Sequence, residues 1–184
     1  MMTVVTDARR PPRARVGVFG IGLEAYWPQF AGLKERCEGY QARVEERIRE
    51  LGADVISAGL VDTAQKARAA GDAFAQAQVD LVLCHAVTYA TSSVVLPVLQ
   101  AAGVPVVLLG LQPTTTLDYV DTDTAEWLAN CAACCVPEIA GVCVRAGIPY
   151  DTVAGTIDDD PRAWAKIAAW VRAAGVARAL RRSR

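Results

Sequence analysis

The strongest constraint in this sequence is an alternation between short, continuously apolar runs and longer amphipathic segments. The first apolar run starts at Val16, and four more cover residues 53–58, 79–84, 104–109 and 148–154. Runs this short and this uniformly apolar are typical of strands buried on both faces, which occur in parallel sheets covered by helices. The pattern therefore predicts an α/β fold with a doubly wound five-stranded parallel sheet. Right-handed crossovers favour the flavodoxin-like strand order 2-1-3-4-5.

The segments between the apolar runs carry helix signals. Apolar residues recur at helical spacing across residues 33–51, and Gly52 fits the position that ends such a helix. Asp62 is expected to cap the next helix, which runs to about Gln78. The third helix follows a polar loop and is expected to stop at Gly103.

Two further helices are expected in the last third of the chain. One begins at residue 123 or 124, runs towards Ala146 and is expected to break near Pro137, because proline interrupts the hydrogen bonds of a helix interior. The last helix begins at Asp160-Pro161, where the aspartate can cap and the proline fits the first turn.

Composition excludes several classes of function. A formal net charge of -1 over 184 residues gives no electrostatic reason to bind nucleic acid or an anionic membrane. No apolar run reaches the length of a membrane span, and residues 1–14 are expected to form a flexible arm without the apolar core of a secretory signal. Six cysteines without the spacing of a small secreted domain favour reduced thiols. We therefore expect a cytoplasmic protein in which residues 15–184 form one domain.

The first apolar run opens into a glycine-rich and aromatic loop. Ligands of doubly wound sheets bind beyond the carboxyl ends of the strands, so this loop is the first candidate site. Residues 20–25 fit a permissive dinucleotide fingerprint, but Tyr26-Trp27-Pro28 stands where the helix should begin. Tyr26, Trp27 and Gln29 suit a sugar better, because aromatic faces stack on C–H groups and amides bridge hydroxyls. The alternative is that Trp27 and Phe30 pack against a neighbouring subunit or helix.

The only histidine, His85, follows the third apolar run. A histidine just past a parallel strand can act as an acid, a base or a hydrogen-bond donor. The adjacent Cys84 is either a buried core thiol or a reactive one, and a reactive thiol would allow a cofactor-free racemase.

Three cysteines gather in the fourth helical segment as Cys131-x-x-Cys134-Cys135. A structural zinc site would need two more ligands, so a packing face of small residues is favoured over a metal site. Glu138 interrupts the apolar run behind them, and it is expected either to have a buried partner or to face an interface.

Loop motifs spread over four of the predicted units carry a family resemblance. They are residues 18–22, 26–33, 58–62, 88–92, 111–113 and 130–141. Together these motifs resemble the N-terminal domain of the L-fucose/L-arabinose isomerase superfamily, in its arabinose isomerase-like branch. The resemblance covers about Arg15 to Arg184, nearly the whole chain.

The resemblance implies a Mn²⁺-dependent aldose–ketose isomerase that works as a homo-oligomer on monosaccharides, with its active site between subunits. The metal ligands would come from other domains, so this chain alone would bind no metal and turn over no sugar. Its expected role is to position substrate and to make oligomer contacts. The alternative, from another class, is a stand-alone domain that binds sugar or assembles without chemistry.

The resemblance also implies substrate contacts near Tyr26 to Gln29 and near Asn130. The full set of expected sugar-binding residues is Tyr26, Trp27, Gln29, His85, Tyr89, Gln112, Asn130 and Cys134. Typical arabinose isomerases resemble Asn-Gln-x-x-His-Gly-Gly-x-Glu in the region that here spans Asn130 to Glu138. Thiols therefore stand where an amide and an imidazole would meet the sugar hydroxyls.

Overall fold

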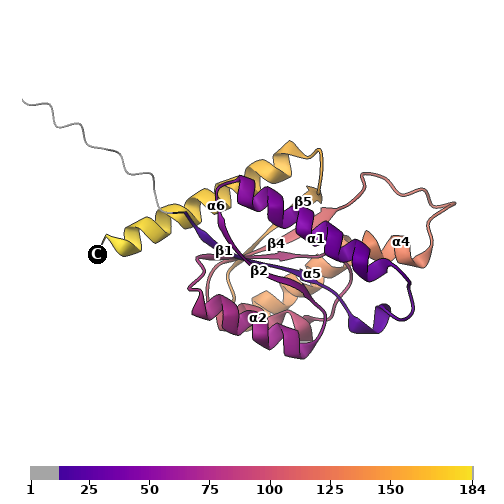
Figure 1. The fold of residues 1–184 in the computed structure, drawn as a ribbon, viewed down its shortest axis with the longest axis horizontal. Coiled ribbons are helices and arrows are strands. Elements are labelled where there is room, and N and C mark those ends of the chain that lie inside the picture. Colours follow the sequence, from indigo (N-terminus) through magenta and orange to yellow (C-terminus); the bar gives the residue numbers. More distant parts are fainter. Residues whose placement is uncertain (1–12, 184) are drawn as a thin grey trace, which may run out of the picture.

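The protein folds around one parallel sheet, seen here in a computed structural model that describes residues 13–183. Its strands are β1 (Arg15–Ile21), β2 (Asp54–Val61), β3 (Leu81–His85), β4 (Val106–Gln112) and β5 (Tyr150–Thr156). They are ordered β2-β1-β3-β4-β5, and helices cover both faces (Figure 1). The predicted α/β, flavodoxin-like architecture is confirmed, strand order included. Residues 1–12 of the predicted arm lie outside the described residues.

Two apolar cores join the sheet to its helices. Helices α1 (Leu33–Glu50) and α6 (Pro161–Arg182) cover one face, and α2 (Ala64–Gln76), α3 (Leu96–Ala102) and α5 (Ala132–Ala146) cover the other. Successive side chains of a strand point to opposite faces. Accordingly, Val16 and Val18 of β1 lie in the core against α1 and α6. Phe19 and Ile21 lie in the core against α2, α3 and α5.

Four strands extend further towards their carboxyl ends than predicted. β2 continues to Val61 instead of residue 58, β3 includes His85, β4 continues to Gln112 instead of stopping at residue 109, and β5 continues to Thr156 instead of residue 154. The reason is that backbone pairing continues whatever the side chain: Leu111 pairs with Gly155 and Gln112 with Thr156. His85 and Gln112 are therefore held by the sheet and not by mobile loops.

The cap of α2 differs from the prediction. Thr63, not Asp62, caps this helix, because the Thr63 hydroxyl accepts the backbone N–H of Lys66 at 3.2 Å. Asp62 is buried and instead accepts the indole N–H of Trp27 at 2.9 Å. Where predicted, Asp160 caps α6 and Gly103 ends α3.

The long helix predicted from residue 123 is divided at Asn130, not at Pro137. It consists of α4 (Thr124–Ala129) and α5, and Pro137 lies inside α5. Asn130 ends α4 because its side-chain amide donates to the carbonyl of Glu126 and its own carbonyl accepts from Gln112. Pro137 leaves only the carbonyl of Ala133 without its helical donor, and Ala133 is exposed to solvent.

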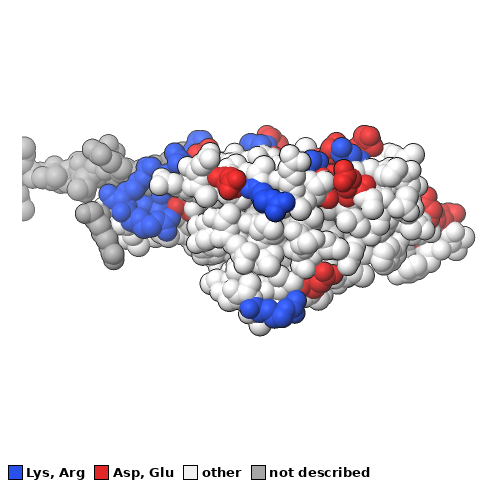
Figure 2. All heavy atoms as spheres, turned by 90° about the horizontal axis from the view of Figure 1, so that it is seen from below, with Lys and Arg blue, Asp and Glu red and all other residues white. Residues whose placement is uncertain are grey.

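Basic side chains gather at the end of the molecule where α6 ends. Figure 2 shows Lys and Arg side chains gathered where α6 ends, and Arg178, Arg181 and Arg182 line a hollow there around Asp80. The carboxyl ends of the strands lie at the opposite end of the molecule (Figure 1).

Within residues 13–183, no helix is long and apolar enough to cross a membrane.

Candidate functional site

The most developed polar site lies where β4 ends and α5 begins. The side-chain amide of Gln112, the last residue of β4, donates to the backbone carbonyl of Asn130 at 2.8 Å. The hydroxyl of Thr114 donates to the side-chain oxygen of Asn130 at 2.8 Å. Asn130 in turn donates to the Glu126 carbonyl at 3.1 Å and is only 6% exposed. Gln112 and Asn130 are both predicted sugar-binding residues, and the structure places them in contact.

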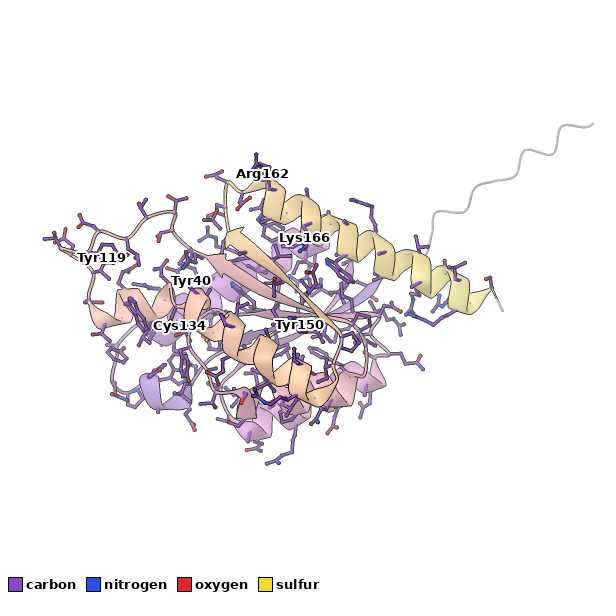
Figure 3. The ribbon with its side chains drawn as sticks, turned by 180° about the vertical axis from the view of Figure 1, so that it is seen from behind. Tyr40, Tyr119, Cys134, Tyr150, Arg162 and Lys166 are labelled. Atoms are coloured by element: carbon purple, nitrogen blue, oxygen red, sulfur yellow. The ribbon has the colours of Figure 1, made fainter. Side chains whose placement is uncertain are left out.

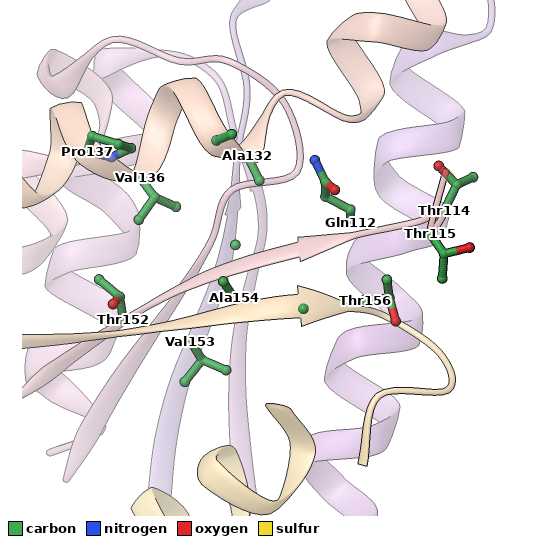
Figure 4. Close-up of a pocket in the computed structure, with 13 residues that line it drawn as sticks. Gln112, Thr114, Thr115, Ala132, Val136, Pro137, Thr152, Val153, Ala154 and Thr156 are labelled. Atoms are coloured by element: carbon green, nitrogen blue, oxygen red, sulfur yellow. The ribbon is translucent and has the colours of Figure 1, made fainter. Parts of the chain in front are cut away.

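Two adjoining hollows open beside this network. The larger, of about 420 Å³, lies between β4, β5 and α5 (Figure 4), and the second, of about 380 Å³, lies under the loop that follows β4. Both fall within the size range of small-molecule sites. Gln112, Thr114 and Thr115 line both of them. We call these two hollows together the Gln112–Asn130 cleft.

No residue that lines the Gln112–Asn130 cleft carries a charge. Its polar side chains are Gln112, Asn130, Tyr119 and five threonines, Thr114, Thr115, Thr116, Thr152 and Thr156. In Figure 4, Thr114, Thr115 and Thr156 stand at one end of the larger hollow near Gln112, and Ala132 and Val136 of α5 lie along its side. The lining thus combines hydroxyls and amides with an apolar wall.

The larger hollow exists because β5 is the edge strand and α5 does not cover all of it. Thr152 and Ala154 of β5 are exposed. Gly110 allows α5 to approach β4, since a Cβ there would lie 3.3 Å from Val136 Cγ2. Residues between Gly110 and Thr156 therefore line both hollows of the cleft.

His85, the last residue of β3, is completely buried, at 0% exposure. Its Nδ1 lies 3.0 Å from the side-chain oxygen of Gln41, and its Nε2 lies 3.2 Å from the carbonyl oxygen of Leu111. Burial lowers the pKa of His85 to about 4, although the contact with Leu111 opposes this shift. The imidazole is therefore neutral near pH 7. Its contact with the carbonyl of Leu111 joins it to the backbone next to Gln112.

Trp27 packs inside its own chain. Its indole N–H is bonded to Asp62, and its ring lies over Gly22, where an added Cβ would be 2.9 Å from Cζ2. The ring fills the space above the glycine that a pyrophosphate would need in a dinucleotide site. Gln29 also bonds within the loop, donating to the carbonyl of Ala25. The contacts of Trp27 correspond to the packing alternative, here within one chain.

Tyr26 and Tyr89 belong to a second group, at the start of α5. The Tyr89 hydroxyl donates to Glu138 Oε2 at 3.0 Å, and this hydrogen bond raises the pKa of Tyr89. The pKa of Tyr26 is raised by burial and by the nearby thiols of Cys131 and Cys135. Glu138, for which the sequence predicts a partner or an interface, therefore has Tyr89 as its partner.

The eight predicted sugar-binding residues do not form a single site. Gln112 and Asn130 lie at the cleft, whereas Tyr26 and Tyr89 lie near the thiols of α5. Cys134 is exposed on the first turn of α5 (Figure 3). The remaining residues, Trp27, Gln29 and His85, make hydrogen bonds within the chain.

Sequence reasoning missed the threonines of the cleft. The run Thr114-Thr115-Thr116 follows closely after the fourth strand. Ligands of doubly wound sheets bind beyond the carboxyl ends of the strands, so this run could have been predicted as part of the site. Thr156 was missed because the predicted fifth strand ended two residues early.

Cys84, considered as a reactive thiol, is 1% exposed, and burial raises its pKa well above the usual value, so it cannot meet a substrate.

The cysteines of α5 do not fit a manganese ion. Within the described residues, no three His, Cys, Asp or Glu side chains come together to hold a metal. The Cys135 thiol donates to the carbonyl of Thr88 and accepts from the N–H of Ala90, both at 3.3 Å. Manganese prefers oxygen ligands, so a thiol-rich helix start is a poor site for it.

Comparison with known proteins identifies no family. No protein-family model matches the chain, and no curated protein gives a significant match to its sequence. The function must therefore be inferred from the geometry and chemistry of the site itself.

Proposed function

We propose that the Gln112–Asn130 cleft binds a monosaccharide or a similar neutral polyol. The observation that supports this most is the uncharged lining, in which amides and hydroxyls surround an apolar wall. No cation stands in the lining to replace the hydration of a phosphate or a carboxylate, so such a ligand would depend on backbone N–H groups alone. Amides and hydroxyls both donate and accept, which matches the hydroxyls of a sugar. The wall of Ala132, Val136 and Ala154 suits its C–H face.

The polar groups of the cleft are fixed before a ligand arrives. Gln112 is anchored by the Asn130 carbonyl, and Asn130 is held by Thr114 and by Glu126. Side chains that are already ordered lose less conformational entropy when they bind. Weak hydrogen bonds to sugar hydroxyls can therefore yield useful affinity at this site.

We propose further that the chain is the substrate-positioning domain of a metal-dependent aldose–ketose isomerase. The support for this step is the resemblance of its loop motifs to the L-fucose/L-arabinose isomerases. In that role Gln112, Asn130 and Thr114 orient the sugar, and His85 keeps Leu111 and the end of β4 in place. The Mn²⁺ that polarises the substrate in such enzymes would be held by other domains, and assembly into a homo-oligomer would bring them to this cleft.

A second candidate is a stand-alone sugar-binding domain without chemistry. It is favoured by one observation: the polar groups of the cleft are already ordered by hydrogen bonds among Gln112, Thr114 and Asn130. The two candidates differ in their need for a partner. A stand-alone binder should hold sugar alone with full affinity, whereas a positioning domain should bind much more tightly when the metal-bearing domains are present.

The test is calorimetric titration of the protein with neutral pentoses and hexoses, using sugar phosphates as charged controls. We expect neutral aldoses or ketoses to bind and Gln112→Leu to weaken binding roughly threefold to tenfold, because one neutral hydrogen bond contributes about 0.5–1.5 kcal/mol. Gln100→Leu, on the exposed surface of α3, is the matched control and should change nothing. Preferential binding of the phosphates, or equal loss in both variants, would contradict the proposal.

A further inference from the structure

Two cysteines flank the wall of the cleft and have no part in the binding proposed above. Ala132 and Ala133 line the larger hollow, and Cys131 and Cys134 stand on either side of them in the sequence. Cys131 is the residue that caps the start of α5, and Cys134 lies in the first turn. Their spacing is the Cys-x-x-Cys pattern of dithiol redox centres.

The backbone brings these two thiols to the same side of the helix start. The N–H of Cys134 donates to the carbonyl of Cys131 at 3.1 Å, which is the three-residue hydrogen bond of a tight turn. Side chains three residues apart eclipse one another in such a turn. Consistent with this, burial raises the pKa of Cys131 to about 12, and a side-chain hydrogen bond between Cys131 and Cys134 adds to the shift.

The two thiols differ in access to solvent. Cys134 is exposed on the first turn of α5 (Figure 3), whereas Cys131 is 3% exposed. The third thiol, Cys135, is 0% exposed and is occupied by Thr88 and Ala90. The arrangement therefore supplies one accessible thiol and one sheltered thiol beside it.

We propose that Cys131 and Cys134 form a redox-active dithiol that exchanges with the disulfides of small thiol compounds of the glutathione class. The proposal does not depend on sugar binding, since it concerns only the thiols and their geometry. Disulfides of this kind in reducing compartments are transient and serve catalysis or redox sensing. A bond between these cysteines would fix the turn that follows Asn130 and so alter one wall of the cleft.

The exchange proceeds in two balanced steps. The thiolate of Cys134 attacks one sulfur of the small disulfide, forms a mixed disulfide and releases one small thiolate. Cys131 then gives its proton to the small thiolate released in the first step and attacks the sulfur of Cys134, which releases the second small thiolate. The two released thiolates take up the two protons that the cysteines lost. The protein loses two electrons, and the small disulfide is reduced to two thiols.

The test is to equilibrate the native protein with mixtures of reduced and oxidised glutathione, quench with acid and alkylate the free thiols. Cleavage after glutamate releases residues 127–138, a peptide whose only cysteines are Cys131, Cys134 and Cys135. Tandem mass spectrometry then locates the bond. We expect a Cys131–Cys134 disulfide with Cys135 alkylated, and an oxidised fraction that follows a two-electron dependence on the glutathione ratio.

Three variants give the test its controls. Cys131→Ser should keep glutathione attached to Cys134, because the attacking thiol of the second step is gone. Cys134→Ser should abolish both products, and Cys37→Ser, at a buried thiol of α1, should behave as the native protein. A mixed disulfide that persists in the native protein, a bond to Cys135, or no reaction at all would overturn the proposal, and none of these results depends on a variant's stability.

Discussion

Acidification from about pH 7.5 to about pH 5 is expected to reduce the free energy of unfolding by about 2 kcal/mol through His85 alone. This residue is the only histidine of the chain, it is fully buried, and burial lowers its pKa to about 4. Unfolding exposes the ring, whose pKa then returns to about 6.5.

Acid lowers the free energy of unfolding here because the unfolded state, and not the folded one, binds the proton. As the pH falls below about 6.5, the unfolded chain takes up a proton on His85, whereas the folded protein does not until about pH 4. The unfolded state is therefore favoured progressively across this window. At about pH 5 protonation favours the unfolded state roughly thirtyfold, which is about 2 kcal/mol. Well below pH 4 the loss of stability levels off at about 3.4 kcal/mol.

The assay is urea unfolding at a series of pH values, with the native protein and His85→Gln. Glutamine keeps one donor and one acceptor but does not titrate, so the difference between the two curves isolates His85 from the carboxylates. The ring C–H signals of the single histidine give a second, direct readout in the native protein by NMR. A ring that titrates near pH 6.5, or a variant with an unchanged pH dependence, would refute the reasoning.

Two matched pairs of variants test other parts of the fold. Asp80→Ala should lower the free energy of unfolding by about 3–5 kcal/mol, because it leaves the buried Arg178 without its partner, whereas Asp54→Ala, in an exposed ion pair, should cost less than about 1 kcal/mol. Similar losses in the two variants under urea would contradict this difference. Gly71→Ala should cost about 1–3 kcal/mol, since its Cβ would lie 2.7 Å from a side chain of α3. Gly39→Ala, with nothing within 4 Å, should stabilise α1 by about 0.5–1 kcal/mol, and thermal melts that reverse this order would rule out the explanation.

The sheet could be predicted because burial on both faces leaves a continuous apolar signature in the sequence. The ends of the strands could not, because Gln112 and Thr156 pair through their backbones while their side chains have the character of loop residues. The same limit applies to the helix break. The tendency of proline to interrupt helices predicts a break at Pro137. The end of α4 is instead set by the hydrogen bond from Gln112 to the Asn130 carbonyl, which joins residues 18 positions apart.

The candidate site was predictable in part for a similar reason. Gln112 and Asn130 were predicted from the loop motifs that carry the family resemblance, and both lie at the edge of the sheet where ligands of such folds bind. Trp27 could not be placed, because its partner Asp62 is 35 residues away and no local pattern marks that bond. A buried indole N–H needs an acceptor. Here the acceptor is Asp62, which follows β2, and the hydrogen bond holds the ring against the protein.

The measurement that tests the central claim most directly is a two-dimensional amide NMR spectrum of the protein with and without a neutral pentose. The account predicts shifts in the side-chain amides of Gln112 and Asn130 and in the backbone amides of residues 114–116 and 156, while the amides near Trp27 and Arg178 stay in place. Unchanged cleft signals at saturating sugar, or shifts confined to the Trp27 loop, would contradict the claim that this cleft is the binding site.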